Sequence, residues 1–179
     1  MSHVLHINAS ATLTNSVSRT ATDHIIANLA PTEITSRDLA KTPLPQVDEA
    51  WVNARLVPAD DRSETDTDIL SLSDRLIAEL KAADTVVIGL PLYNFGAPAS
   101  LKAWMDLVAR PGVTFRYTED GPIGLLTDKK ATVVYAAGGV PMESEMDFAS
   151  PHLRVFLGFI GITDVTFVDA KTLPEMAAA

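Results

Sequence analysis

The run Thr85-Val86-Val87-Ile88-Gly89-Leu90 is the feature that most constrains the fold of this chain. An unbroken apolar stretch of this length, rich in β-branched residues, is typical of a strand that is buried on both faces. Such strands belong to parallel sheets whose two faces are covered by helices. A helical stripe precedes the run, and a second helix is predicted from about Ser100 to Arg110. This central strand therefore predicts an α/β protein.

Apolar runs and helical stripes alternate along the rest of the chain as well. Five strands separated by helices imply a parallel sheet with right-handed crossovers. We predict the flavodoxin-like version of the doubly wound α/β fold, with a five-stranded parallel sheet in the order 2-1-3-4-5. Residues 1–179 are expected to form a single domain, and residues 111–129 an irregular segment. The other four strands are predicted near residues 3–8, 33–39, 131–136 and 165–168.

The segment that follows the fifth predicted strand is short. Only residues 171–179 remain there, too few for the helix that usually packs against the last strand of this fold. We therefore expect part of one sheet face to be covered by a second subunit.

Composition argues against several classes of function. The net charge of −9 disfavours binding to nucleic acid and to anionic membrane surfaces, both of which are held through basic residues. Because the chain has no cysteine, it has no thiol nucleophile, and any redox chemistry requires a bound cofactor. The first strand begins almost at the initiator Met, without a basic and apolar leader, and no apolar run is long enough to cross a bilayer. We expect a cytoplasmic protein.

No side chain suggests metal or hydrolytic chemistry. The four histidines share no metal-ligand spacing, so we predict no metal site. The chain also lacks the G-x-S-x-G pattern of a nucleophile elbow. We therefore predict no hydrolytic activity and interpret the histidines as packing or surface residues: His3, His6, His24 and His152.

The loop after the first strand is crowded with hydroxyl groups and contains no glycine, so it is not a dinucleotide-binding fingerprint. Hydroxyl groups and the free N–H groups at a helix N-terminus together can hold a phosphate. The alternative is that Ser16 or Ser18 only caps the following helix. The place of the loop in a flavodoxin-like pattern favours a mononucleotide phosphate site, with its hydroxyls at Ser10, Thr12, Thr14, Ser16 and Ser18.

Two further loops follow strands at the same edge of the predicted sheet. Tyr93-Asn94-Phe95-Gly96 follows the most buried strand, where open α/β sheets hold their ligands. Its aromatic rings and backbone N–H groups suit a flat ring with a polar edge, although two core aromatics in an ordinary turn are the alternative. Gly138-Gly139 follows the fourth strand and allows a close approach of the backbone to a ligand. We predict that the three loops form one site.

Several long motifs resemble the bacterial FMN-dependent NADH-azoreductases, which are also described as FMN-dependent NADH:quinone oxidoreductases. The similarity is dense from about residue 71 to residue 168 and looser in the first strand and loop. The first loop departs from the family pattern at Ala11-Thr12, and the fourth-strand loop departs from it at Ala136-Ala137. The motifs that carry the resemblance are Pro91-Leu92-Tyr93-Asn94-Phe95-Gly96, Leu101-Lys102-Ala103-Trp104, Gly112 to Glu119, Gly121 to Leu126 and Leu157-Gly158-Phe159-Ile160-Gly161.

The resemblance implies a flavodoxin-like homodimer with one non-covalent FMN per subunit. It implies ping-pong hydride transfer, in which NADH reduces the flavin and a quinone or an azo compound then receives two electrons. Because the FMN carries this chemistry, the resemblance implies no catalytic side chain. Aromatic side chains at Phe115, Tyr117 and Phe159 are implied to wall a substrate cleft between the subunits. The implied FMN contacts are Ser10, Ser16, Val17 and Ser18 on the phosphate side, Leu92, Tyr93, Asn94 and Phe95 along the ring, and Ala136, Ala137, Gly138 and Gly139 at its other edge.

Two other functions remain open at this point. A flavodoxin-like electron carrier would bind FMN without turning over a small substrate, and an acidic surface suits docking to a protein partner. The departures from the family pattern also allow a relative that has lost flavin and serves as an interaction module. The aromatic residues between positions 111 and 119 favour the enzyme over the carrier, because they fit a substrate cleft.

Overall fold

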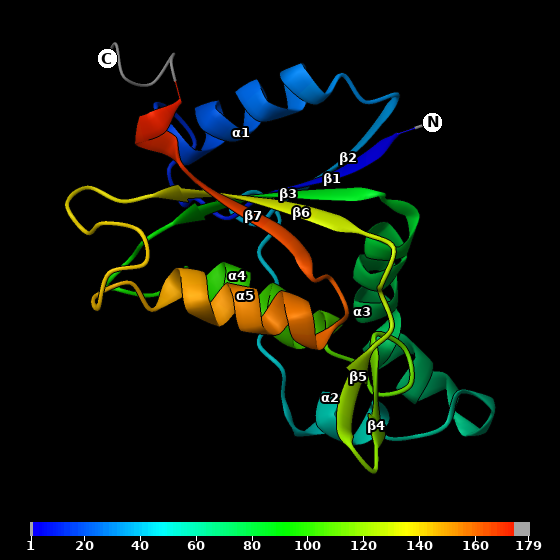
Figure 1. The fold of residues 1–179 in the computed structure, drawn as a ribbon. Helices are drawn as coiled ribbons and strands as arrows, with labels where there is room; N and C mark the ends of the chain where they lie inside the picture. The colour runs from blue at the N-terminus through cyan, green and yellow to red at the C-terminus, as the bar shows by residue number, and fades with distance from the viewer. Residues whose placement is uncertain (1, 174–179) are drawn as a thin grey trace.

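A sheet of five parallel strands lies at the centre of the computed structural model, which describes residues 2–173 (Figure 1). The strands run in the order β2-β1-β3-β6-β7, which is the predicted order 2-1-3-4-5 when the parallel strands alone are counted. Residues 174–179 of the predicted domain lie outside the described residues. The strand bounds are β1 His3–Asn8, β2 Glu33–Asp38, β3 Thr85–Pro91, β6 Lys130–Ala136 and β7 Asp164–Asp169.

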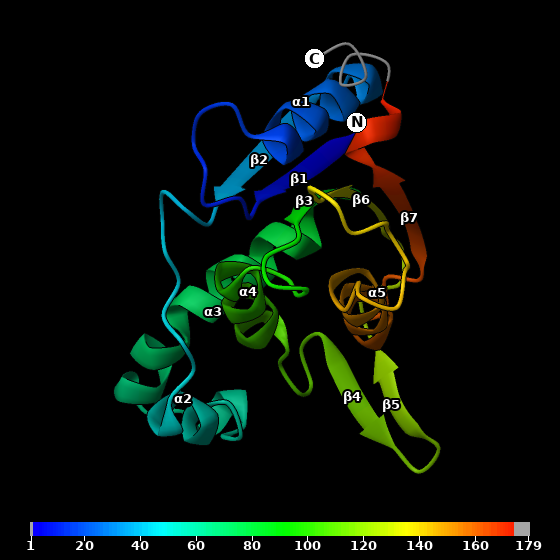
Figure 2. The same cartoon turned by 90° about the vertical axis from the view of Figure 1, so that its left-hand side faces the viewer.

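The two faces of the sheet are covered unequally. The helix α1 (Val17–Leu29) and the short 3-10 turn η2 (Ala170–Thr172) lie on one face. Three helices lie on the other face (Figures 1 and 2): α3, α4 and α5, with bounds Glu64–Ala82, Ala99–Val108 and Ala149–Phe159. The small helices α2 (Glu49–Ala54) and η1 (Ala59–Asp61) precede α3 along the chain. Among residues 2–173, one face of the sheet therefore has less helical cover than the other.

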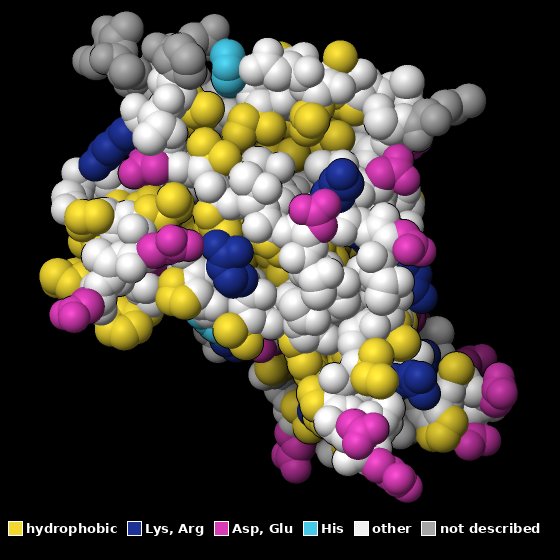
Figure 3. Space-filling view, in the orientation of Figure 1, with side chains coloured by type: hydrophobic (Ala, Val, Ile, Leu, Met, Phe, Trp, Pro, Cys, Tyr) yellow, Lys and Arg dark blue, Asp and Glu magenta, His cyan; other side chains and the backbone are white. Residues whose placement is uncertain are grey.

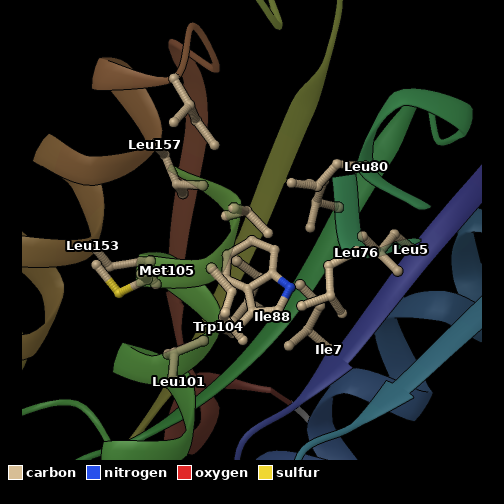
Figure 4. Packing of buried hydrophobic residues seen from close by; sticks show 14 of the residues in the cluster. Leu5, Ile7, Leu76, Leu80, Ile88, Leu101, Trp104, Met105, Leu153 and Leu157 are labelled. Carbon is tan, nitrogen blue, oxygen red and sulfur yellow. The ribbon is translucent and has the colours of Figure 1, made fainter. Parts of the chain in front are cut away.

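The main core fills the space between the sheet and α3, α4 and α5. Trp104 of α4 is fully buried there, beside Met105 of the same helix and Ile88 of β3 (Figure 4). On the opposite face, the buried residues form two small clusters, one around Val87 and one around Ala21 and Ala170. Most of the buried apolar area therefore lies on the three-helix side of the sheet. Because burial of apolar area is the main source of stability, that side contributes most of the stabilisation.

Local signals in the sequence explain where α3 begins. The hydroxyl of Ser63 accepts a hydrogen bond from the backbone N–H of Asp66 at 3.1 Å, and the Asp66 carboxylate accepts one from the Ser63 N–H at 3.0 Å. This reciprocal capping box satisfies two of the N–H groups that every helix start leaves unpaired. The helix then presents its apolar stripe to the sheet, with Leu76 and Leu80 fully buried.

The segment 111–129 is partly ordered as strands, so the prediction of an irregular segment was wrong there. β4 (Phe115–Thr118) and β5 (Gly121–Gly124) form an antiparallel hairpin in which Phe115 pairs with Gly124. The hairpin extends from the end of α5, away from the central sheet (Figure 2). Its base is held by the N–H of Leu126, which donates to the carbonyl of Ile160 at 2.9 Å.

Candidate functional site

A cavity of about 610 Å³ opens at the carboxyl edge of the sheet. The three predicted loops all contribute to its wall, because the carboxyl ends of parallel strands meet at one edge. The turn η2 closes it on a further side. Nine of the predicted contact residues line this cavity: Ser10, Ser16, Val17, Ser18, Leu92, Tyr93, Ala136, Ala137 and Gly138.

The other three predicted contacts do not line the cavity as it stands: Asn94, Phe95 and Gly139. Asn94 and Phe95 form the tip of the loop after β3, with φ angles of 49° and 69°. Two hydrogen bonds between Tyr93 and Gly96, both 3.0 Å from N to O, close this tight loop. Asn tolerates this left-handed backbone, whereas at Phe95 it costs about 1 kcal/mol or more. The loop thus holds its tip in a strained form, with the Phe95 side chain exposed.

A chain of hydroxyl groups connects the first loop to the loop after β3. The Ser16 hydroxyl donates to the Ser10 hydroxyl at 2.9 Å, and Ser18 Oγ lies 3.4 Å from Ser16 Oγ. The phenolic oxygen of Tyr93 lies 3.4 Å from Ser10 Oγ and accepts a hydrogen bond of 3.2 Å from the backbone N–H of Ala11. The three serines are buried, so these hydroxyl groups form a preorganised polar end of the cavity.

The start of α1 is open to a ligand. Ser16 is the N-cap residue, yet its side chain makes no capping hydrogen bond, and its hydroxyl donates to Ser10. The first N–H groups of a helix have no partner within the helix and favour negative charge. The interpretation of Ser16 as an ordinary cap is therefore wrong, and the first turn of α1 keeps its anion-binding capacity.

The guanidinium of Arg19 shapes the first loop from behind. It donates to the carbonyl of Thr12 at 2.9 Å and to the carbonyl of Ser10 at 2.8 Å. It also forms a bidentate ion pair with the carboxylate of Asp38 at the end of β2, with N–O distances of 2.6 and 2.9 Å. Hydrogen bonding from Arg19 lowers the pKa of Asp38 to about 2. These contacts of Arg19 were not predicted from the sequence, although Arg19 follows the loop directly.

Five lining residues are not among the predicted FMN contacts: Thr12, Asn15, Pro91, Ala170 and Lys171. Thr12 and Asn15 belong to the first loop, and the hydroxyl-rich pattern already pointed to that segment. Lys171 follows β7, and its ammonium donates a hydrogen bond of 3.0 Å to the carbonyl of Gly138. No local pattern marks Lys171, because it meets Gly138 only through the pairing of β6 with β7.

The three predicted cleft aromatics form one cluster away from the cavity. Phe115 contacts Tyr117 edge to face, with ring centroids 5.4 Å apart, and lies 4.2 Å from the ring of Phe159. Phe115 is buried, whereas Tyr117 is 72% exposed. The cluster lies where the hairpin meets the end of α5, and the cavity loops lie near the beginning of that helix (Figure 1). Within one chain, the structure does not bring these aromatics to the cavity.

Comparisons with known proteins identify the family. The model of a family with a flavodoxin-like fold matches residues 2–179. A protein of Jannaschia sp. (strain CCS1) named FMN-dependent NADH:quinone oxidoreductase 1 is 57% identical over 97% of this chain and 90% of its own length. The chain belongs to the family of FMN-dependent NADH:quinone oxidoreductases. A second such oxidoreductase, from Hahella chejuensis (strain KCTC 2396), is 49% identical over 97% of the chain and 86% of its own length.

Solved structures of azoreductases share the fold. An azoreductase from Bacillus anthracis str. Sterne superposes with a TM-score of 0.85 at 30% identity, over 99% of this chain and 92% of its own. An FMN-dependent NADH-azoreductase from Bacillus anthracis str. Ames Ancestor, solved in complex with FMN, gives a TM-score of 0.82 at 27% identity, over 98% and 91%. The predicted family resemblance and the flavodoxin-like parallel sheet are confirmed.

The described residues offer neither a membrane-spanning helix nor a metal-binding cluster. Residues 2–173 contain no helix with the length and apolar character needed to span a bilayer. The same residues contain no group of three or more His, Asp or Glu side chains placed to hold a metal ion. His6 is buried instead, and its ring nitrogen Nε2 lies 2.9 Å from the hydroxyl of Thr22.

Proposed function

We propose that this chain is an FMN-dependent oxidoreductase that takes electrons from NADH and delivers them to quinones or azo compounds. The observation that carries the proposal is the composition of one cavity. It combines a hydroxyl-rich end at the start of α1 with an aromatic and glycine-containing wall from the loops after β3 and β6. Its volume of about 610 Å³ falls in the range of cofactor sites. The names of the relatives support the same cofactor and substrates.

The residues present fit the two ends of FMN. We place the phosphate at the first turn of α1, where the uncapped N–H groups and the buried hydroxyls of Ser10, Ser16 and Ser18 meet. The ring would lie along Leu92 and Tyr93 and reach the tip residues Asn94 and Phe95. Its other edge would face the segment 136–139, where a Cβ built on Gly138 or Gly139 meets nothing within 4 Å.

The side chains of this protein contribute binding and orientation. FMN held by these residues would supply the two-electron chemistry between NADH and the acceptor, both of which would use the same place in turn. Backbone N–H groups at the tip of the loop after β3 point to the ring edge in this proposal and favour negative charge there. Among the described residues, none is required to act as a nucleophile.

We propose that the substrate cleft is completed in a homodimer. The cluster of Phe115, Tyr117 and Phe159 lies away from its own cavity, but it lies on the side of the molecule that bears exposed apolar residues. Figure 3 shows hydrophobic side chains gathered over the loop before α5 and over the hairpin. The exposed fractions of Phe148 and Val155 are 65% and 72%. A second copy on this face would bring one subunit's aromatic cluster toward the other's cavity.

The visible spectrum of the purified chain tests the cofactor. We expect a yellow protein with flavin absorbance, or a colourless one that acquires it when FMN is added. A chain that carries no FMN as purified and binds none when FMN is added would overturn the proposed function and would favour an interaction module. A cytoplasmic setting, where NADH is available, fits the proposal.

The net charge of −9 would also suit an electron carrier that docks to a protein partner. Anaerobic reduction with NADH distinguishes such a carrier from the proposed enzyme. We expect NADH to bleach the flavin absorbance rapidly and a benzoquinone to restore it. A carrier would bind FMN but stay oxidised after NADH is added, and that result would contradict the enzyme.

A further inference from the structure

The cavity has a single charged side chain in its wall. Among the described residues that line it, only Lys171 carries a charge, and the others are apolar, hydroxyl-bearing or amide side chains. The nearby Arg19 does not line this cavity, because its guanidinium faces two loop carbonyls and Asp38. Lys171 is therefore the cation that a ligand in this cavity would meet.

The backbone on both sides of Lys171 is fixed. Ala170 is fully buried and packs in a small cluster with Ala21 of α1 and Val134 of β6. The carboxylate of Asp169 accepts a hydrogen bond of 3.0 Å from the Lys171 N–H, which holds the turn η2. The base of the lysine side chain thus stands against α1, one turn along from the residues that open the cavity.

The ammonium group of Lys171 is held at the cavity wall and still has N–H donors that make no hydrogen bond within the cavity wall. Its hydrogen bond of 3.0 Å to the Gly138 carbonyl uses one N–H. A lysine ammonium has three N–H donors, so two remain for a ligand. The position between the first turn of α1 and the loop after β6 suits an anion that also takes N–H groups from the helix start.

We propose that Lys171 binds the phosphate of the flavin mononucleotide and makes the site selective for FMN over riboflavin. The inference rests on the proposed function. A phosphate dianion approaching a chain of net charge −9 is repelled at long range, and the hydroxyl groups of the first loop are neutral. One ammonium in the wall supplies the compensating charge and a charge-assisted hydrogen bond.

Flavin titrations of four forms of the 179-residue chain test the proposal: the original sequence, Lys171→Met, Lys171→Arg and Lys130→Met. We expect Lys171→Met to raise the dissociation constant of FMN about three- to tenfold at low ionic strength, and less in high salt, because the lysine is partly in solvent. Riboflavin, which lacks the phosphate, should bind equally well to every form. Lys171→Arg should restore most of the FMN affinity.

Lys130→Met is the matched control. It removes the same charge with the same replacement, but it lies at the amino end of β6, about 20 Å of strand away from the cavity edge. We expect no change in its affinity for either flavin. An equal effect of both lysine changes would reduce the role of Lys171 to net charge and overturn the proposal.

The remaining outcomes distinguish a failure of the Lys171 inference from a failure of the proposed function. Unchanged FMN affinity in Lys171→Met would overturn the inference while leaving the proposed function intact, since the original chain still binds FMN. An equal loss for FMN and riboflavin would assign Lys171 to shaping the Gly138 loop instead. A change confined to the reduction potential of the bound flavin would place the ammonium at the ring. Failure of the original chain to bind either flavin would instead refute the proposed function itself.

Discussion

Asp38 is the residue on which the shape of the first loop depends. Its carboxylate accepts hydrogen bonds from both terminal nitrogens of the Arg19 guanidinium. It also accepts hydrogen bonds from the backbone N–H groups of Ala40 and Lys41, at 3.1 and 3.3 Å. Both side chains of the pair are mostly buried, at 13% and 14% exposure. A carboxylate with this many donors strongly prefers its charged form.

We expect Asp38→Asn to lower the free energy of unfolding by up to about 2 kcal/mol near pH 7. Because the folded-state pKa is lowered from 3.8 to about 2, the charged carboxylate stabilises the fold fully above about pH 4. That contribution is lost as the pH falls toward 2. Urea unfolding of both forms between neutral and acidic pH should therefore show a difference that shrinks below about pH 4. Asp60→Asn, at an exposed position, should show no such trend.

Tyr93 links two walls of the cavity through a single oxygen. Tyr93→Phe removes the acceptor of the Ala11 N–H and the contact with Ser10. We expect FMN affinity to fall about three- to tenfold, the usual effect of losing one or two hydrogen bonds, with little change in the unfolding midpoint. Fluorescence titration and urea unfolding measure the two quantities. A large drop in stability with unchanged affinity would show that the hydroxyl serves the fold alone.

At the scale of elements, the hairpin β4–β5 is attached to the molecule through two glycines. A Cβ added to Gly124 would lie 2.0 Å from the Gly161 nitrogen, and one added to Gly161 would lie 2.8 Å from the Leu126 nitrogen. Gly161 also has a φ of +105°, which side-chain-bearing residues rarely adopt. The close backbone contact that places the hairpin therefore requires glycine at both positions.

We expect Gly161→Ala to destabilise the chain by about 3 kcal/mol or more, because it adds both a steric clash and backbone strain. Gly158→Ala is the matched control in α5, where an added Cβ meets nothing within 4 Å. It should be neutral or stabilising by up to about 1 kcal/mol, since alanine is the better helix former. Thermal unfolding of the two variants compares them directly. Equal effects would contradict the close contact.

The same hairpin shows which strands could not be predicted from sequence patterns. The parallel strands could be predicted because each is an apolar run between helical stripes, and their order follows from handedness rules. β4 and β5 have four residues each, and Pro122 argues against a strand. Their pairing depends on docking against α5. In the same way, Ser10 and Tyr93 could be predicted from their loops, whereas Lys171 enters the cavity only through tertiary packing.

At the scale of the whole molecule, the two layers of helix are unequal and apolar side chains remain exposed on the side of α5. The hairpin and the loop before α5 contribute Tyr117, Met146 and Phe148, with exposures from 51% to 72%. Scattered exposed apolar residues are normal, but several on one side are typical of an interface. A second subunit has an available surface here, on the three-helix side and not on the less covered sheet face where we expected it from the sequence.

We therefore expect the chain to sediment as a dimer at micromolar concentration. Val155→Lys places a charge on the exposed side of α5 and should shift the chain to a monomer, because an unpaired charge in an interface is costly. Leu56→Lys, a change at a residue 64% exposed near α2, is the control and should leave the dimer intact. If the aromatic clusters of both subunits complete the clefts, Val155→Lys should retain FMN but lose most quinone reduction. A fully active monomer would show that one chain forms the whole site.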